Sequence, residues 1–143
     1  MAFNILIVDD SAVMRAMIKR VALLSGVPVG AFREASNGEE GLRAVREAPV
    51  DLVLLDVNMP VMGGEEMLRR LRAEPETAAL PVIVVSTEGS ETRVHALEGL
   101  GVAFVHKPFA PETLRDTIIR VTGVTPDDEH YAVPAGDGFD RDF

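Results

Sequence analysis

Short apolar runs alternate with helix-like segments five times along this chain, and this alternation limits the possible folds more than any other feature. The apolar runs are nearly continuous, which is typical of strands covered on both faces of a parallel sheet. Strands are expected at 4–9, 32–35, 52–56, 82–86 and 103–106, and helices at 11–25, 38–46, 64–73, 90–100 and 111–121. The pattern predicts an α/β fold, a doubly wound five-stranded parallel sheet with helices on both faces.

Each expected helix carries apolar residues at a helical spacing, and this face should pack on the sheet. In helix 11–25, which Ser11 should cap, the face consists of Val13, Met14, Met17, Ile18, Val21 and Leu24. The inward residues expected of the later helices are Leu42 and Val45; Met67, Leu68 and Leu71; Val94 and Leu97; and Leu114, Ile118 and Val121. Helix 90–100 is mostly polar, so we expect it to be lightly anchored.

Composition and hydropathy exclude several classes of protein. The 143 residues include no cysteine, so disulfides and thiolate metal sites are excluded. The net charge of −9 and the lack of a basic stripe argue against direct nucleic-acid binding. No targeting segment is visible, and the apolar runs are far shorter than the about 20 residues that cross a bilayer. We expect a cytoplasmic protein that does not insert into membranes.

The periodic pattern ends at Gly123. We expect one domain over residues 1–123, followed by a flexible acidic tail over 124–143 that contains two prolines, six acidic residues and one basic residue. No further domain is visible after residue 123, so output is expected to pass through contact with another protein. The tail is either inert or, with Phe139 and Phe143 among its acids, a short docking segment.

Polar residues gather where four of the expected strands end: Asp9 and Asp10 on the first, Asp56 on the third, Ser86 and Thr87 on the fourth, and Lys107 on the fifth. In a parallel sheet these ends meet at one edge, where ligands bind. Like charges about 4 Å apart repel by about 4 kcal/mol at an effective dielectric constant of 20, so three carboxylates together need a cation. Lys107 alone cannot neutralise three, and oxygen ligands favour a hard ion such as Mg²⁺.

Such a cluster is suited to phosphoryl transfer, in which positioning and charge neutralisation supply most of the catalysis. Asp56 can act as the nucleophile and form an acyl phosphate. Asp10 would hold the metal directly, and Asp9 would hold it directly or through water. The backbone carbonyl of Asn58 could complete the coordination.

Lys107 and the Ser86 hydroxyl would hold the phosphoryl oxygens that do not contact the metal. Taken singly, residues of these types at strand ends are more often caps, turn residues or solvated charges. The prediction depends on their joint placement on four strand ends.

Four segments carry a specific family pattern: Val8-Asp9-Asp10-Ser11, Asp56-Val57-Asn58-Met59-Pro60-Val61-Met62-Gly63-Gly64, Pro81 through Ser86, and Lys107-Pro108-Phe109. On these segments, residues 4–122 resemble the receiver domains of two-component response regulators, and CheY-type chemotaxis regulators in particular. The resemblance implies the flavodoxin- or CheY-like strand order 2-1-3-4-5 with five helices. It also implies that Asp9 and Asp10 are the acidic Mg²⁺ pair and that Asp56 is the phospho-acceptor.

By the same resemblance, Ser86 is similar to the switch Ser/Thr of the family, Lys107 to its lysine, and Phe104 stands at the switch aromatic. The Lys107–Pro108 bond should be cis. The implied partners are a histidine kinase or phosphotransfer protein and a downstream target protein. We expect phosphorylated Asp56 to draw Ser86 inward, so that Phe104 turns and the face of 90–100, 103–106 and 111–121 is remodelled. Such a chain is a signalling switch rather than an enzyme.

Three departures from the family pattern concern the output. Gly63 replaces the usual Asp and removes a side-chain cap from helix 64–73, so we expect a more mobile preceding loop. Phe104 stands where chemotaxis regulators usually carry Tyr. The 101–107 stretch is one residue shorter than in typical chemotaxis regulators. Chemotaxis signalling is the favoured pathway, and a phosphate sink or phosphorelay intermediate remains an alternative.

Two unrelated functions also remain as alternatives. A haloacid-dehalogenase-type phosphatase needs a second Asp two residues after its nucleophile, but Asn58 occupies that position and cannot donate the proton. A flavodoxin-like cofactor binder needs a phosphate loop after the first strand, where Asp9 and Asp10 would repel a phosphate.

Overall fold

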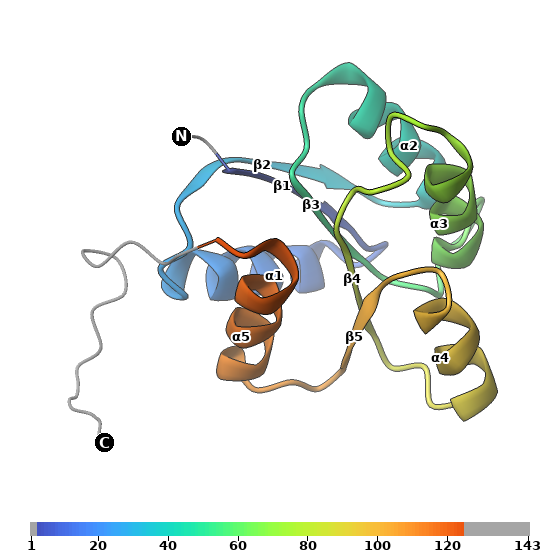
Figure 1. Ribbon diagram of the computed structural model, residues 1–143. Helices are drawn as coiled ribbons and strands as arrows, with labels where there is room; N and C mark the ends of the chain where they lie inside the picture. The colour runs from blue at the N-terminus through green and yellow to red at the C-terminus, as the bar shows by residue number, and fades with distance from the viewer. Residues whose placement is uncertain (1–2, 125–143) are drawn as a thin grey trace.

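The computed structural model describes residues 3–124, which form one sheet between two layers of helices (Figure 1). All five strands are parallel and lie in the order β2-β1-β3-β4-β5, which confirms the expected fold. Their bounds are Phe3–Val8 for β1, Val29–Ala35 for β2, Leu52–Leu55 for β3, Val82–Ser86 for β4 and Ala103–His106 for β5. β2 begins at Val29, before its expected start at residue 32.

The helices divide unevenly between the two faces of the sheet. Their bounds are Ala12–Leu24 for α1, Gly38–Glu47 for α2, Gly64–Ala73 for α3, Glu91–Glu98 for α4 and Pro111–Thr122 for α5. α1 and α5 share one apolar core with the sheet, and α2, α3 and α4 share a second core on the opposite face (Figure 1).

The continuous apolar runs arise because successive strand residues point to opposite faces. In β1, Ile5 and Ile7 belong to the core under α1 and α5, whereas Leu6 and Val8 belong to the core under α2 and α3. All four side chains are fully buried. Burying one such side chain stabilises the fold by about 1.5–3 kcal/mol, so these strands strongly favour the two-sided arrangement.

The prediction of which residues of α1 face the sheet is wrong in part. Ile18 is buried and Met14 and Val21 are partly buried, but three other residues of that face are exposed: Val13 (76%), Met17 (48%) and Leu24 (73%). The apolar residues of α1 cover more of its circumference than the sheet does, so one flank of the predicted face points to solvent. In the other four helices, the residues expected to point inward are buried or partly buried.

Side-chain caps begin three of the helices. The Ser11 hydroxyl accepts the Met14 N–H at the start of α1, and Asn37 and Ser90 cap α2 and α4 in the same way. α3 has Gly63 at its N-cap position and therefore no side-chain cap, as its sequence predicts.

None of the helices within residues 3–124 is long and apolar enough to span a membrane. The predicted flexible acidic tail begins at residue 124, and its remaining residues, 125–143, lie outside the described part of the chain.

Candidate functional site

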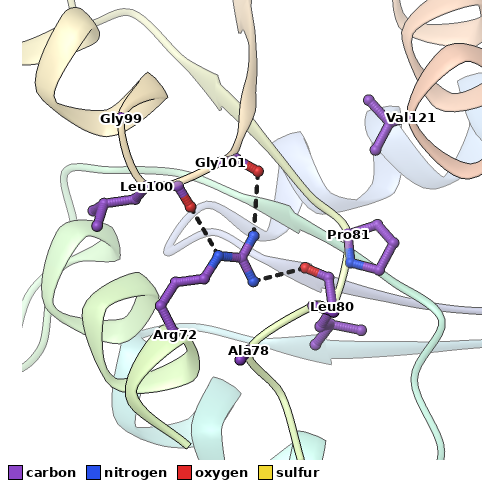
Figure 2. Close-up of a pocket in the computed structure, with 9 residues that line it drawn as sticks. Arg72, Ala78, Leu80, Pro81, Gly99, Leu100, Gly101 and Val121 are labelled. Atoms are coloured by element: carbon purple, nitrogen blue, oxygen red, sulfur yellow. Dashed lines mark hydrogen bonds between the residues drawn. The ribbon is translucent and has the colours of Figure 1, made fainter. Parts of the chain in front are cut away.

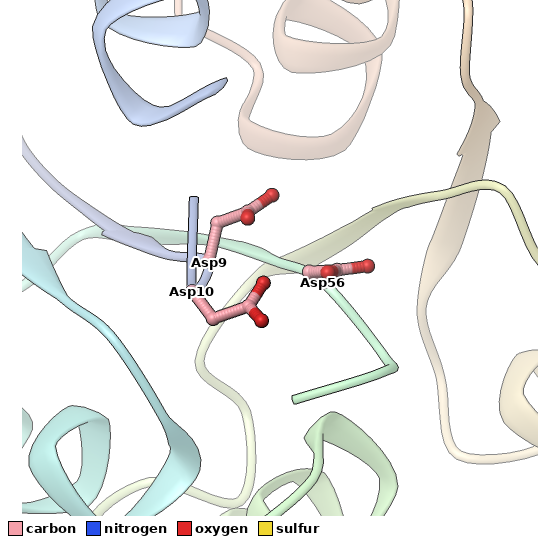
Figure 3. Close-up of side chains that lie close together, drawn as sticks. All are labelled: Asp9, Asp10 and Asp56. Carbon is pink, nitrogen blue, oxygen red and sulfur yellow. The ribbon is translucent and has the colours of Figure 1, made fainter. Parts of the chain in front are cut away.

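The acidic residues predicted to meet at one edge of the sheet do so. β1 and β3 are neighbours at the centre of the sheet, with Val8 opposite Leu55, so Asp9 and Asp56 follow at the same level. The Asp56 N–H donates to the Val8 carbonyl at 2.9 Å and holds the two strand ends together. One carboxylate oxygen each of Asp9, Asp10 and Asp56 lies within 4.8 Å of the others (Figure 3).

Two of the three carboxylates are withdrawn from solvent. Asp9 is 1% exposed and Asp56 is 8% exposed, whereas Asp10 lies at the surface. Burial raises the pKa of the Asp56 carboxyl above its ordinary value, since the charged form loses hydration, and the charge of Asp9 raises it too. Lys107, the Val57 N–H and the Ser86 hydroxyl lower this pKa without offsetting the rise. With three carboxylates beside it, Lys107 is outnumbered by the acidic groups of the cluster.

Lys107 extends from the end of β5 into the acid cluster. Its Nζ donates to Asp9 Oδ2 at 2.9 Å and lies 3.9 Å from Asp56 Oδ1. The side chain is only 12% exposed, and its backbone N–H donates to the Ser86 carbonyl. The Lys107–Pro108 bond is cis, as the family resemblance implies. The lysine is thus close enough to interact with both buried carboxylates, and its contact with Asp9 is the shorter one.

The two expected switch residues share one face of the sheet. Ser86 is fully buried at the end of β4, where its hydroxyl accepts the Glu88 N–H at 3.2 Å. Phe104 of β5 is opposite Val84 of β4, so its side chain points to the same face of the sheet as Val84 and Ser86. The Phe104 ring is partly buried and lies 4.5 Å from the ring of His106, tilted by 42°. Both switch candidates therefore lie on the α4 side of the sheet.

The conformation of the segment after β3 is fixed by the close approach of the start of α3. The Gly64 N–H donates to the Val57 carbonyl at 2.9 Å, and a Cβ on Gly64 would lie 2.9 Å from Val57 Cα. Only glycine fits there. Asn58 is exposed between these points, two residues beyond Asp56. Val61, further along, is 79% exposed and has a φ of 67°, a conformation that strains a β-branched residue.

The structure adds a residue pair that the sequence reasoning missed. Arg15 of α1 donates to the carbonyl of Asp9 at 2.6 Å and to Glu34 of β2 at 2.8 Å. A basic residue one turn after a helix cap is the available sequence signal, because helical side chains lean back toward the helix start. Thr87, by contrast, is exposed at its strand end.

A cavity of about 540 Å³ lies near the starts of β4 and β5, at the opposite edge of the sheet from the acid cluster. Figure 2 shows Arg72 in its lining, next to Leu80, Leu100 and Gly101. Arg72 of α3 donates there to the carbonyls of Leu80 and Leu100 at 2.8 Å each, and to that of Gly101 at 3.3 Å. These contacts tie the connection before β4 to the connection before β5. Because its donors are directed at backbone carbonyls, Arg72 has a structural role.

Comparison with known proteins agrees with this geometry. The family model for the response regulator receiver domain matches residues 5–119. The chain is 34% identical over 122 residues to a chemotaxis protein CheY homolog of Campylobacter jejuni, covering 84% of this chain and 92% of that protein. It is also 40% identical over 108 residues to a protein-glutamate methylesterase/protein-glutamine glutaminase of Bacillus licheniformis, covering 73% of this chain. The match spans only 29% of that longer protein.

Among solved structures, chemotaxis protein CheY4 of Vibrio cholerae superposes with a TM-score of 0.75 at 32% identity, covering 85% of this chain and 99% of that chain. The resemblance on the strand-end motifs is therefore confirmed. The chain belongs to the response regulator receiver domain family.

Proposed function

We propose that this chain is a response regulator whose Asp56 accepts a phosphoryl group in a Mg²⁺-dependent reaction. The observation that supports this most strongly is the meeting of three carboxylates within 4.8 Å, two of them buried, beside a single lysine. Residues 1–123 form the receiver domain in this proposal. It acts as a signalling switch that assists its own phosphorylation, not as an enzyme with a separate substrate.

The residues present fit a magnesium ion. The ligands would be the carboxylates of Asp9, Asp10 and Asp56 and the backbone carbonyl of Asn58, an all-oxygen set of the kind that Mg²⁺ prefers. Burial, and separately the charge of Asp9, raise the pKa of Asp56, and a divalent cation beside these carboxylates would favour their charged forms. When bound, the ion would neutralise charge on the phosphoryl oxygens.

The protein's own residues prepare Asp56 for attack on phosphorus. Its Oδ1 accepts the Val57 N–H at 2.8 Å, which fixes the rotation of the carboxylate. A carboxylate oxygen forms the new P–O bond, and the bond from phosphorus to the donor nitrogen breaks. Lys107, 3.9 Å from Asp56, holds a phosphoryl oxygen in the product, and Ser86 holds a second. The donor is a histidine kinase or a phosphotransfer protein.

The switch begins at Ser86. The Ser86 hydroxyl already interacts with Asp56, and drawing it further toward the phosphoryl group would weaken its acceptance of the Glu88 N–H and loosen the connection from β4 to α4. Phe104 then turns on the same face and remodels the surface of α4, β5 and α5, where a downstream protein binds. Helix α4 is suited to move because Leu97 is the one residue between Glu91 and Glu98 that is buried, so little apolar contact anchors this helix.

Chemotaxis or motility signalling is the pathway we propose, since relatives from Campylobacter and Vibrio carry chemotaxis names. A phosphorelay intermediate or phosphate sink would use the same site with different partners. An aspartyl-phosphate phosphatase is disfavoured, because Asn58 cannot act as the general acid.

Intact-mass spectrometry after incubation with acetyl phosphate and Mg²⁺ tests the phospho-acceptor. We expect the parent chain to gain the mass of one phosphoryl group. Asp56→Asn, and the parent chain in EDTA, should not gain this mass. Equal phosphorylation of Asp56→Asn would assign the acceptor elsewhere. Ser86→Ala should remain phosphorylatable yet show a smaller phosphorylation-dependent rise in target affinity than the parent.

A further inference from the structure

A basic side chain of α1 reaches back to the edge of the sheet from which the helix starts. Arg15 lies four residues after the cap Ser11, and Cα–Cβ bonds in a helix lean toward its N-terminus. Its Nη1 therefore meets the carbonyl oxygen of Asp9 at 2.6 Å, a short charge-assisted hydrogen bond. The side chain is 17% exposed, so the contact is largely sheltered from water.

The carbonyl that Arg15 holds belongs to the peptide between the first two acids. Because a peptide unit is planar, fixing the oxygen of Asp9 also fixes the nitrogen and Cα of Asp10. The other groups of Asp9 are held separately, since its N–H donates to Ala35 and its carboxylate accepts from Ser11 and Lys107.

Asp10 has no such restraint of its own. It is exposed, and no hydrogen bond to its carboxylate is found within residues 3–124, yet that carboxylate lies within the cluster. Its direction therefore depends on the backbone that Arg15 fixes.

A carboxylate from the neighbouring strand orients the arginine. Glu34 is opposite Ile7 in the pairing of β2 with β1, and its Oε1 accepts the Arg15 Nε–H at 2.8 Å. Lys19, one turn further along α1, lies 4.0 Å from the other oxygen of Glu34, and within residues 3–124 no hydrogen bond or ion pair joins it to Asp9. Partly exposed ion pairs contribute little to stability, so the pair's main effect is to direct the guanidinium.

We propose that Arg15 is a positioning residue for the metal site: by holding the carbonyl of Asp9, it directs the Asp10 carboxylate toward Asp9 and Asp56. This inference rests on the Mg²⁺ binding proposed above. Charge alone predicts the opposite effect, because a cation beside a cation site weakens binding. The sign of the change in Mg²⁺ affinity therefore separates positioning from electrostatics.

The test compares the full chain with Arg15→Gln, Arg15→Lys and the matched control Lys19→Gln. The control removes the same charge from the same helix and the same Glu34 partner, but leaves the Asp9 carbonyl bond intact. Titration calorimetry measures Mg²⁺ affinity at a temperature where circular dichroism shows every variant folded. Amide exchange at Asp10 and Ser11, followed by NMR in EDTA, reports the backbone without any metal.

We expect Arg15→Gln to weaken Mg²⁺ binding by about tenfold, the low end for residues that orient metal ligands. Lys19→Gln should keep or slightly raise the affinity, and Arg15→Lys should fall between parent and Arg15→Gln. Amide exchange at Asp10 and Ser11 should be faster than in the parent in Arg15→Gln, but not in Lys19→Gln. A purely structural role would lower the unfolding temperature and leave the Mg²⁺ affinity of the folded protein unchanged.

Two results would overturn the inference: unchanged or tighter Mg²⁺ binding in Arg15→Gln, or amide exchange at Asp10 and Ser11 equal to that of the parent. A parent chain that does not bind Mg²⁺ would refute the proposed function instead. In that case amide exchange alone decides whether Arg15 fixes the backbone. If Arg15→Gln does not fold, Arg15→Lys replaces it: this variant keeps the charge, so weaker Mg²⁺ binding than in the parent reports the loss of positioning, and unchanged binding contradicts it.

Discussion

Replacing Asp56 with Asn should stabilise the metal-free protein, although it removes the proposed phospho-acceptor. With carboxylate oxygens within 4.8 Å, Asp56 is repelled by Asp9 and by Asp10 by about 3.5 kcal/mol each at an effective dielectric constant of 20. Lys107, at 3.9 Å, attracts it by about 4 kcal/mol on the same scale. The exposure of Asp10 reduces the net repulsion, so we expect a gain of about 1–3 kcal/mol in unfolding free energy. The Asn oxygen can still accept the Val57 N–H.

The pH dependence of this gain follows from the raised pKa of Asp56. Burial raises that pKa in the folded state, so the parent's folded form holds the proton to higher pH than its unfolded form. The corresponding stability is present below the ordinary pKa and is lost as pH rises through the folded-state pKa. The variant and the parent should therefore converge in acid, and their difference should be largest at neutral pH.

Urea unfolding followed by circular dichroism in EDTA measures this difference, with Asp116→Asn as a control. Asp116 is an exposed carboxylate of α5, and its replacement should change stability by less than about 0.5 kcal/mol. Adding Mg²⁺ should stabilise the parent by more than Asp56→Asn, since ligand binding to the folded state adds to stability. The electrostatic reasoning is refuted if Asp56→Asn is no more stable than the parent in EDTA at neutral pH.

Three further substitutions test how the site is supported. Gly64→Ala should lower the unfolding free energy in urea by about 2 kcal/mol or more, because its Cβ would collide with the Val57 backbone. Val61→Asn should raise it by about 1 kcal/mol, since Asn tolerates the positive φ better than a β-branched residue. Leu97→Ala should cost about 2–4 kcal/mol, and hydrogen exchange should show amide protection falling first in α4.

The strand-end residues were predictable because parallel topology decides where they lie. Continuous apolar runs locate the strands that end in these residues, and parallel strands bring their carboxyl ends to one edge, so Asp9, Asp56 and Lys107 had to approach each other. The roles expected of Ser86 and Phe104 stay predictions, although both lie on the expected face of the sheet.

The exposed flank of α1 and the Arg15–Glu34 pair were not predictable in the same way. Periodicity shows which residues could face the sheet, but the sheet covers only part of the apolar circumference, and Met17 lies outside it. A contact between Arg15 and Glu34 depends on the rotamer of a long side chain and on the register of β2 against β1. Neither quantity is encoded in local residue spacing.

The arginine at the far edge of the sheet affects how α4 can move. Arg72 ties the carbonyls of Leu100 and Gly101, just beyond the last turn of α4, to α3 and to Leu80. The start of α4 is held less firmly, by an ion pair of 3.3 Å between the partly exposed side chains of Arg93 and Glu65 of α3. Its cap Ser90 follows a connection that leads directly from Ser86. Because a partly exposed ion pair restrains a helix less than hydrogen bonds to its backbone, we expect a displacement at the carboxyl edge of the sheet to rotate α4 about its C-terminal end, with the largest movement nearest to Ser86.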